Sequence, residues 1–338
     1  MCGICGIVNL TGEPVSEGHV AMMAQRLRHR GPEIIGAVTP HPAIGLGHTR
    51  LKVIDLSTAA NQPMGNRERT TWIVYNGEVY NYRALRDDLI GQGRQFRSQS
   101  DTEVILQAYA QWGEDCVARL DGMFAFAIFD ARQRRLLFAR DRTGKKPLFY
   151  YRDQERFIFA SEIKALLVHP AVPAAFNERV LPHYLTYGYV PAPDTCYAGI
   201  ESVPPATQVT LDVPTGRISQ RRYWTLTIPA TASHPTHAAA IGEVRERLTE
   251  AVRKRLMADV PLGAFLSGGI DSTIVVGLMS RLMDQPVHTF SIGFRGDARY
   301  DETSYARLAA RHFQTRHTEF VVEPKAFDLI ERLVYHHD

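Results

Sequence analysis

The first two thirds of the chain alternate short apolar runs with amphipathic segments. β-Branched residues are enriched at 4–9, 43–54 and 72–79, which predicts strands, and helical spacing predicts helices at 18–29, 82–91 and 102–113. Apolar runs at 124–129 and 136–139, joined by a polar turn, predict two more strands, and others are expected at 147–151 and 157–160. Strands that outnumber the helices between them indicate an α+β layered domain.

The pattern changes after residues 170–222, which are rich in proline and are expected to be irregular, and after 228–236, which is typical of a linker. Strands predicted at 260–266, 287–292 and 317–322 then alternate with helices at 237–256, 271–283, 302–312 and 326–336. This alternation predicts an α/β doubly wound parallel sheet. We therefore expect a first domain at 2–224, a linker at 225–236 and a second domain at 237–338.

Composition excludes several classes of protein. With 338 residues, 45% apolar and 22% charged, the chain is typical of a globular protein of about two domains, not of a disordered tail or a collagen-like fibre. Its longest apolar run, 123–129, is far shorter than a membrane span, and a net charge of +3 is too small for a nucleic-acid-binding surface. Four cysteines and no signal peptide predict a reducing cytoplasm.

Cys2 is the first candidate for chemistry, because it directly follows Met1. Removal of Met1 would leave a thiol and an α-amine on one residue, and that amine, with an ordinary pKa of about 7.7–8.0, can serve as the base for the thiol. The alternatives are a passive cysteine or a pair with Cys5. Residues 3–8 have the pattern of a strand, in which positions three apart point to opposite faces, so a disulfide is not expected.

The loop at 267–272 is the second candidate, because it joins a predicted parallel strand to a helix. Ligands of open α/β sheets bind at this end of a strand, and glycines next to a helix N-terminus suit a phosphate. Ser267 and Ser272 add hydroxyl groups, and Asp271 could hold Mg²⁺ against a pyrophosphate. The spacing is not that of a Walker A loop, and the alternative is a glycine turn with a serine cap.

Taken together, these segments resemble the glutamine-hydrolysing asparagine synthetases over essentially the whole chain. The first half resembles a class II, N-terminal-nucleophile glutaminase domain, an αββα sandwich, at residues 2–4, 28–32, 48–51, 75–81, 100–103, 122–127, 140–141 and 160–164. The second half resembles the start of an ATP-pyrophosphatase-type synthetase domain, with 266–272 as its loop. The order and spacing of the segments carry the resemblance.

The resemblance implies a role for each glutaminase residue. Cys2 attacks the side-chain amide of glutamine, and Asn76 and the Gly77 N–H form an oxyanion hole. Arg50 holds the α-carboxylate of glutamine as a bidentate pair, and the carboxylates of Glu78 and Asp101 hold its α-ammonium. The glutamine-binding residues that it implies are Arg50, Leu51, Val53, Ile54, Asn76, Gly77, Glu78 and Asp101.

The residues alone leave ordinary alternatives open. Arg50 could form an ion pair on the surface of a strand, and Asn76-Gly77 is also the strongest hairpin-turn dipeptide. Glu78 could be a surface carboxylate, and Asp101 could cap a helix.

In the second half the resemblance implies ATP and Mg²⁺ as cofactors. ATP would convert the aspartate β-carboxylate into an acyl-adenylate, and ammonia would displace AMP from it to give asparagine, with water excluded from both steps. The implied ATP-binding residues are Phe265, Ser267, Gly268, Gly269, Asp271, Ser272 and Ile292, and Asp271 is also the implied Mg²⁺ ligand. The implied partners are glutamine, aspartate and ATP, with neither nucleic acid nor membrane, and a homodimer is allowed.

The chain departs from the family pattern at Glu33, where Asp is usual, at Cys5, where a small or apolar residue is usual, and at Phe265, where Leu is common. The larger departure is that the sequence ends soon after Asp271. We therefore expect a synthetase half that belongs either to a fragment of a longer chain or to a truncated gene product, with three strands and exposed apolar surface, unable to close its ATP site alone. The alternatives are a stand-alone glutaminase or amidotransferase with another carboxylate acceptor, and a non-catalytic truncated product.

Overall fold

The computed structural model describes residues 1–228, 236–294, 301–322 and 326–338. These residues form two compact units, Met1–Thr227 (unit 1) and Ile228–Asp338 (unit 2). The expected linker at 228–236 falls almost wholly outside the described residues, so its structure stays a prediction.

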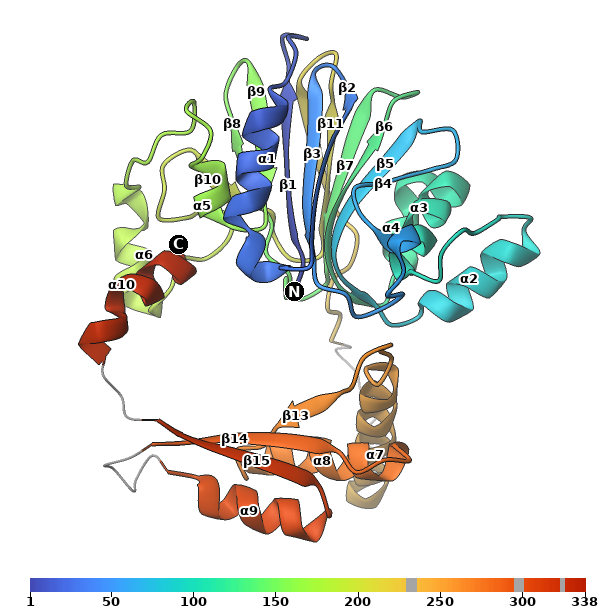
Figure 1. Cartoon of the computed structure of the whole chain (residues 1–338), viewed down its shortest axis with the longest axis vertical. Helices are drawn as coiled ribbons and strands as arrows, with labels where there is room; N and C mark the ends of the chain where they lie inside the picture. Colours follow the sequence, from blue (N-terminus) through green and yellow to red (C-terminus); the bar gives the residue numbers. More distant parts are fainter. Residues whose placement is uncertain (229–235, 295–300, 323–325) are drawn as a thin grey trace. The chain divides into compact units, whose positions relative to one another are not determined.

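Unit 1 is built on two six-stranded antiparallel sheets that pack face to face (Figure 1). The first sheet has the order β10-β8-β9-β1-β3-β2, and the second has the order β12-β11-β7-β6-β5-β4. The strands of the first sheet are β1 (Gly3–Asn9), β2 (Ile34–His41), β3 (Ile44–Arg50), β8 (Phe149–Arg152), β9 (Arg156–Ala160) and β10 (Ile200–Ser202). Those of the second are β4 (Met64–Gly65), β5 (Thr71–Val79), β6 (Gly122–Asp130), β7 (Arg135–Arg140), β11 (Thr207–Asp212) and β12 (Arg217–Arg222).

Strand alternation decides which side chains form the core between the sheets. In β1, Ile4 and Val8 belong to the core shared with the second sheet, whereas Cys5 and Ile7 pack with the helices outside. The helices on the outer side of the first sheet are α1 (Glu17–Arg26) and α5 (Ile163–Leu166). On the outer side of the second sheet α3 (Asp101–Trp112) packs on β5, beside α2 (Tyr82–Gly91) and α4 (Cys116–Arg119) (Figure 1). The result is a four-layer αββα sandwich.

The structure corrects the expectation that residues 170–222 are irregular. This stretch contains α6 (Leu181–Tyr187) and strands β10, β11 and β12, two of which extend the second sheet. Strand β12 is an exposed edge strand with little apolar character, which is why hydrophobic spacing did not predict it. The strand expected at 43–54 ends at Arg50, and the chain then forms a loop.

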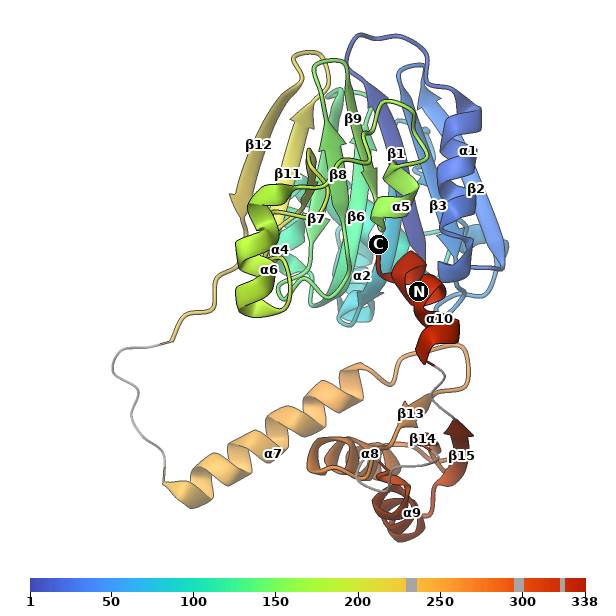
Figure 2. The same ribbon diagram turned by 90° about the vertical axis from the view of Figure 1, so that its left-hand side faces the viewer.

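The described part of unit 2 contains a parallel sheet of three strands and four helices, of which α8 and α9 pack on the sheet. The strands are β13 (Gly263–Phe265), β14 (His288–Phe294) and β15 (Arg316–Val322), in that order. The helices are α7 (His237–Lys254), α8 (Ile270–Leu282), α9 (Thr303–His312) and α10 (Ala326–His337), and α7 packs alongside α8 (Figure 2). Because the strand order advances in one direction, right-handed crossovers place α8 and α9 on the same face of the sheet.

The other face of this sheet is apolar and exposed. Leu266 is buried with the helices, but Phe265, Ile292 and Phe320 are 79%, 50% and 54% exposed. Among the described residues, the three parallel strands and the exposed apolar surface agree with those two parts of the expectation, and closure of the ATP site stays a prediction. Helices on both faces, which a doubly wound sheet has, are not seen in the described part of unit 2. None of the helices described in either unit is long and apolar enough to cross a membrane.

Candidate active site

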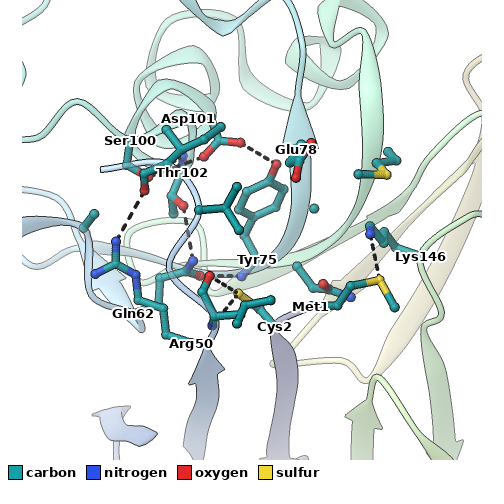
Figure 3. A pocket seen from close by; sticks show the side chains of 17 residues that line it. Met1, Cys2, Arg50, Gln62, Tyr75, Glu78, Ser100, Asp101, Thr102 and Lys146 are labelled. Atoms are coloured by element: carbon teal, nitrogen blue, oxygen red, sulfur yellow. Dashed lines mark hydrogen bonds between the residues drawn. The ribbon is translucent and has the colours of Figure 1, made fainter. Parts of the chain in front are cut away.

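A cavity of 260 Å³ in unit 1 brings the predicted glutaminase residues together (Figure 3). It lies where β1 begins and where β3 and β5 end. The start of β1 and the end of β3 are neighbours because antiparallel pairing places Gly3 beside Thr49. Every residue expected at the nucleophile or in glutamine binding lines this cavity: Cys2, Arg50, Leu51, Val53, Ile54, Asn76, Gly77, Glu78 and Asp101.

Cys2 is held at the start of β1 by contacts on both sides of its backbone. The Arg30 Nε donates to the carbonyl oxygen of Cys2 at 2.9 Å, and the Gly3 N–H donates to Thr49 Oγ1 at 3.0 Å. A side chain at Gly3 would come within 2.7 Å of Thr49 Oγ1 and 2.8 Å of Leu27 Cβ, so only glycine fits there. The Cys2 sulfur lies 3.4 Å from the backbone nitrogen of Leu51.

The Cys2 thiol needs a base in this environment. Burial raises the pKa of the Cys2 thiol. The hydrogen bond with Leu51 and the nearby N-terminal ammonium lower this pKa, but by less than burial raises it. Burial also lowers the pKa of the terminal ammonium at Met1, and the positive charges of Arg30 and Lys146 lower it further. An amine in this pocket is therefore neutral, and able to accept a proton, at a lower pH than in water. Cys5 is not paired with Cys2, since all four cysteines are free.

Arg50 is a buried cation, not a surface residue. It is 3% exposed, and its Nη1 donates to Ser57 O at 2.8 Å and to Asn61 Oδ1 at 2.6 Å. Its Nη2 donates to the carbonyl oxygens of Ile54 and Asp55. These bonds fix the guanidinium in place, so a bidentate pair with a substrate carboxylate would have to displace one of them.

Asn76 and Gly77 lie inside β5 and not in a turn, because they pair with Ala125 and Phe124 of β6. Asn76 is 1% exposed, and its Nδ2 has no hydrogen-bond partner in the structure. A side chain at Gly77 would lie 2.2 Å from the carbonyl oxygen of Met123, which excludes any larger residue. An unpaired buried amide is costly unless a ligand completes its hydrogen bonds.

Asp101 is buried at the start of α3, where Ser100, not Asp101, caps the helix. Its Oδ2 accepts hydrogen bonds from Tyr75 Oη at 2.7 Å and from the Val79 N–H at 3.1 Å. Burial raises the pKa of Asp101, and these hydrogen bonds oppose the rise. Glu78, which is half-buried in β5, lines the same cavity.

Several lining residues were not predicted from the sequence. They are Met1, Ala60, Gln62, Tyr75, Ser100, Thr102, Met123 and Lys146. Tyr75 directly precedes Asn76, and Ser100 and Thr102 flank Asp101, so adjacency could have indicated three of them. Gln62 accepts from the Tyr75 N–H at 2.6 Å and donates to Thr102 Oγ1 at 3.2 Å, a link that no local pattern reveals.

The predicted phosphate loop of unit 2 joins β13 to α8. Ser267 Oγ lies 3.0 Å from Ser272 Oγ and accepts from the Gly269 N–H at 3.2 Å. Gly268 has a φ of +84°, and a side chain there would lie 2.5 Å from the backbone of Tyr305 and Ala306 in α9. The loop therefore exposes backbone at a helix N-terminus, which suits a phosphate.

The remaining ATP-binding candidates lie near this loop. Asp271 is exposed in the first turn of α8. Phe265 and Ile292 share the exposed face of the sheet, on β13 and β14. No group of three or more potential metal-ligating His, Cys, Asp or Glu side chains occurs among the described residues. A Mg²⁺ ion at Asp271 would thus depend on phosphate and water oxygens for its other ligands.

The chain matches known proteins in both units. Residues 1–224 match the glutamine amidotransferase domain family, and residues 243–338 match the asparagine synthase family. A protein of Methanocaldococcus jannaschii, named provisionally as glutamine-hydrolysing asparagine synthetase 2, is 35% identical over 100% of this chain and 68% of its own length. Asparagine synthetase 3 of Bacillus subtilis, also named as glutamine-hydrolysing, is 34% identical over 98% of this chain and 56% of its own.

The chain thus spans between about half and two thirds of the length of these relatives. One solved structure, of an allosteric regulatory enzyme of purine biosynthesis, superposes with a TM-score of 0.51 over 95% of this chain and 80% of its own, at 15% identity, and so shows likeness of fold alone. The matches to both families and the relatives that span the whole chain show that it belongs to the glutamine-hydrolysing asparagine synthetase family, with a glutamine amidotransferase domain at residues 1–224.

Proposed function

We propose that unit 1 hydrolyses glutamine with Cys2 as the nucleophile. The observation that carries this proposal is the shared cavity, in which the Cys2 sulfur, the unpaired Asn76 Nδ2 and the fixed Arg50 guanidinium lie together. The two relatives named above are called glutamine-hydrolysing, which supports the same reaction.

The reaction needs one thiolate and two hydrogen-bond donors. After Met1 is removed, the α-amine of Cys2 takes the thiol proton, and the sulfur attacks the δ-carbon of glutamine. The Asn76 amide and the Gly77 N–H hold the oxyanion of the tetrahedral intermediate. The C–N bond then breaks, the amine returns the proton to the leaving nitrogen, and ammonia departs. Water hydrolyses the thioester to release glutamate and restore the thiol.

The same cavity provides ends of opposite charge for the amino-acid part of the substrate. Arg50 would bind the α-carboxylate, and Glu78 and Asp101 would bind the α-ammonium, with apolar contacts from Leu51, Val53 and Ile54.

Release of glutamate from glutamine by the wild type and by Cys2→Ala tests this proposal. Cys5→Ala is a matched control, because Cys5 is buried on the outer side of β1, with its sulfur toward Val20. We expect Cys2→Ala to lose activity and Cys5→Ala to keep it, and mass spectrometry to show that Met1 has been removed. Equal rates for Cys2→Ala and wild type would refute the nucleophile.

For unit 2 we propose binding of ATP at the loop formed by residues 267–272. ATP would activate the β-carboxylate of aspartate, and ammonia from the glutaminase site would attack the adenylate to give asparagine, AMP and pyrophosphate. Gly268 and Gly269 allow the backbone to approach the phosphates, Ser267 and Ser272 add hydroxyl groups, and Asp271 would hold Mg²⁺.

A second candidate function is glutaminase activity without synthesis of asparagine, with another acceptor or none. It is favoured by the exposed face of the unit 2 sheet, where Phe265 and Ile292 would have to contact adenine without cover. Exchange of pyrophosphate into ATP in the presence of aspartate separates the two. Exchange supports the synthetase, and its absence with glutaminase activity retained supports the second candidate.

A further inference from the structure

We propose that Tyr75 is a positioning residue that makes the glutaminase site selective for the α-ammonium of its substrate. Its phenol fixes Asp101 Oδ2, so that Oδ1 is left to meet the ammonium. This inference rests on the proposed function of unit 1 and adds a residue to it.

The two oxygens of Asp101 have different surroundings. Oδ2 accepts two short bonds, from Tyr75 Oη at 2.7 Å and from the Val79 N–H at 3.1 Å. Oδ1 has a longer contact with Ser100 Oγ, at 3.4 Å, and the Thr102 N–H also donates to the Asp101 carboxylate. A carboxylate with one saturated oxygen cannot rotate without losing those two bonds, so Oδ1 keeps one orientation.

Tyr75 is itself fixed along its backbone. Its N–H donates to Gln62 Oε1 at 2.6 Å, and its carbonyl oxygen lies 3.1 Å from His48 Nε2. Tyr75 is 2% exposed, so its phenol is almost fully shielded from bulk water. A rigid donor of this kind costs little entropy when it orders the carboxylate.

The phenol also favours the charged form of Asp101. Burial raises the pKa of Asp101, whereas a hydrogen bond from Tyr75 favours the ionised carboxylate. Burial and the adjacent carboxylate raise the pKa of Tyr75 far above its ordinary value, so its hydroxyl remains a donor at every working pH. Loss of this donor would therefore favour protonation of Asp101 and weaken its attraction for an ammonium.

Two substrates test the proposal: glutamine and glutaramate, which is glutamine without its α-amino group. In Tyr75→Phe we expect KM for glutamine to rise about 10-fold with kcat unchanged, since a hydrogen bond to a charged group is lost. The kcat/KM for glutaramate should not change, so the preference for glutamine should fall about 10-fold. The acidic midpoint of kcat/KM for glutamine should move to higher pH, because the Asp101 pKa rises.

Tyr109→Phe is a matched control. Its hydroxyl donates to Asp130 Oδ2 at 3.2 Å in another buried tyrosine–aspartate pair, which does not line the cavity. This variant should lose stability as Tyr75→Phe does, without a change in preference. If Tyr75→Phe lowered kcat/KM equally for glutamine and glutaramate, or lowered it for neither, the proposal would be overturned.

Failure of the glutaminase proposal can be recognised separately. Calorimetric binding of glutamine and glutaramate to Cys2→Ala, with and without Tyr75→Phe, measures recognition without the reaction. A loss of preference in this binding supports the role of Tyr75 whatever the nucleophile proves to be, and an unchanged preference refutes it.

Discussion

The guanidinium of Arg30 and the carboxylate of Glu162 form a buried ion pair, with Nη1 and Oε1 2.6 Å apart. The same guanidinium donates through Nε to the Cys2 carbonyl oxygen. Glu162 also pairs with Lys164 at 2.7 Å and contacts His29 Nε2 at 2.9 Å, so one carboxylate organises Arg30, Lys164 and His29 behind the nucleophile. The position of Cys2 thus depends on a residue far away in the sequence.

Glu162→Gln should lower both stability and glutaminase activity. Breaking a buried pair typically costs about 3–5 kcal/mol in the free energy of unfolding, and a released Arg30 would hold Cys2 less firmly. Burial alone would raise the pKa of Glu162, but the hydrogen bonds from Lys164 and Arg30 together with the charge of Arg30 outweigh it and lower the pKa from 4.5 to about 2. The stabilisation is therefore complete above pH 4.5 and is lost as the pH falls toward 2.

Urea unfolding of wild type and Glu162→Gln at a series of pH values measures this difference. The difference in the free energy of unfolding between wild type and Glu162→Gln should become smaller as the pH falls. Glu155→Gln is the control, since the pair of Glu155 with Arg156 is exposed and contributes little. A constant gap from pH 7 to pH 3 would contradict the assignment.

Lys146→Met should shift the pH dependence of glutamine hydrolysis. Lys146 is 5% exposed beside the N-terminus, where its charge lowers the pKa of the terminal ammonium, after burial and Arg30. Without this charge the α-amine of Cys2 would lose its proton at higher pH. The acidic limb of the kcat profile should therefore move to higher pH.

Lys145→Met serves as the comparison for Lys146→Met. Lys145 is exposed and does not line the cavity, so its removal should leave the kcat profile where it is. Identical shifts in the two variants would mean that net charge, and not the place of Lys146, controls the amine.

Asn76→Ala should reduce kcat by about 10²–10³, the usual effect of removing one oxyanion donor. The KM for glutamine should change little, because the amide is needed mainly in the transition state. Steady-state kinetics measure both. In Asn81→Ala, which removes bonds to the backbone of Arg119 and Asp121 outside the cavity, kcat should stay near the wild-type value. A rise in KM alone for Asn76→Ala would contradict the oxyanion role.

Gly268→Ala should destabilise unit 2 strongly, whereas Gly269→Ala should leave its stability almost unchanged. At Gly268 the new side chain meets the backbone of Tyr305 and Ala306 at 2.5 Å, and a φ of +84° adds strain. At Gly269 the φ is −67°, and the nearest contact is Ser267 Oγ at 3.3 Å. We expect the first change to lower the melting temperature and to increase hydrogen exchange in α9, and the second to have little effect. Similar melting curves would refute the close packing.

Sequence reasoning predicted residues defined by contiguous motifs more readily than the contacts between them. Cys2, Asn76 and Asp101 stand in motifs whose order is readable. The acceptors of Arg50 come from a loop after β3, in which Asp55 has a φ of 53°, and no propensity predicts that conformation. Tyr75 and Lys146 owe their importance to partners that only the tertiary fold brings close, such as Asp101 at the start of α3 for Tyr75.

Strands with long apolar runs were predictable, but β11, which places only Val209 and Leu211 in the core, and the polar edge strand β12 were not. The apolar side chains of β1, β5 and β6 are buried, so hydrophobic spacing predicted these strands. Strand β12 is mostly exposed and shows little such spacing, although its backbone pairs with β11 along its full length.

Because Gly268 packs closely against the first turn of α9, the conformation of the loop depends on the position of that helix. Substitutions in the loop at residues 267–272 and in the first turn of α9 are therefore expected to depend on one another. A descendant that enlarges the residue at 268 would need a compensating shift of the backbone at Tyr305 and Ala306, and a change that displaces α9 would be selected against through the loop.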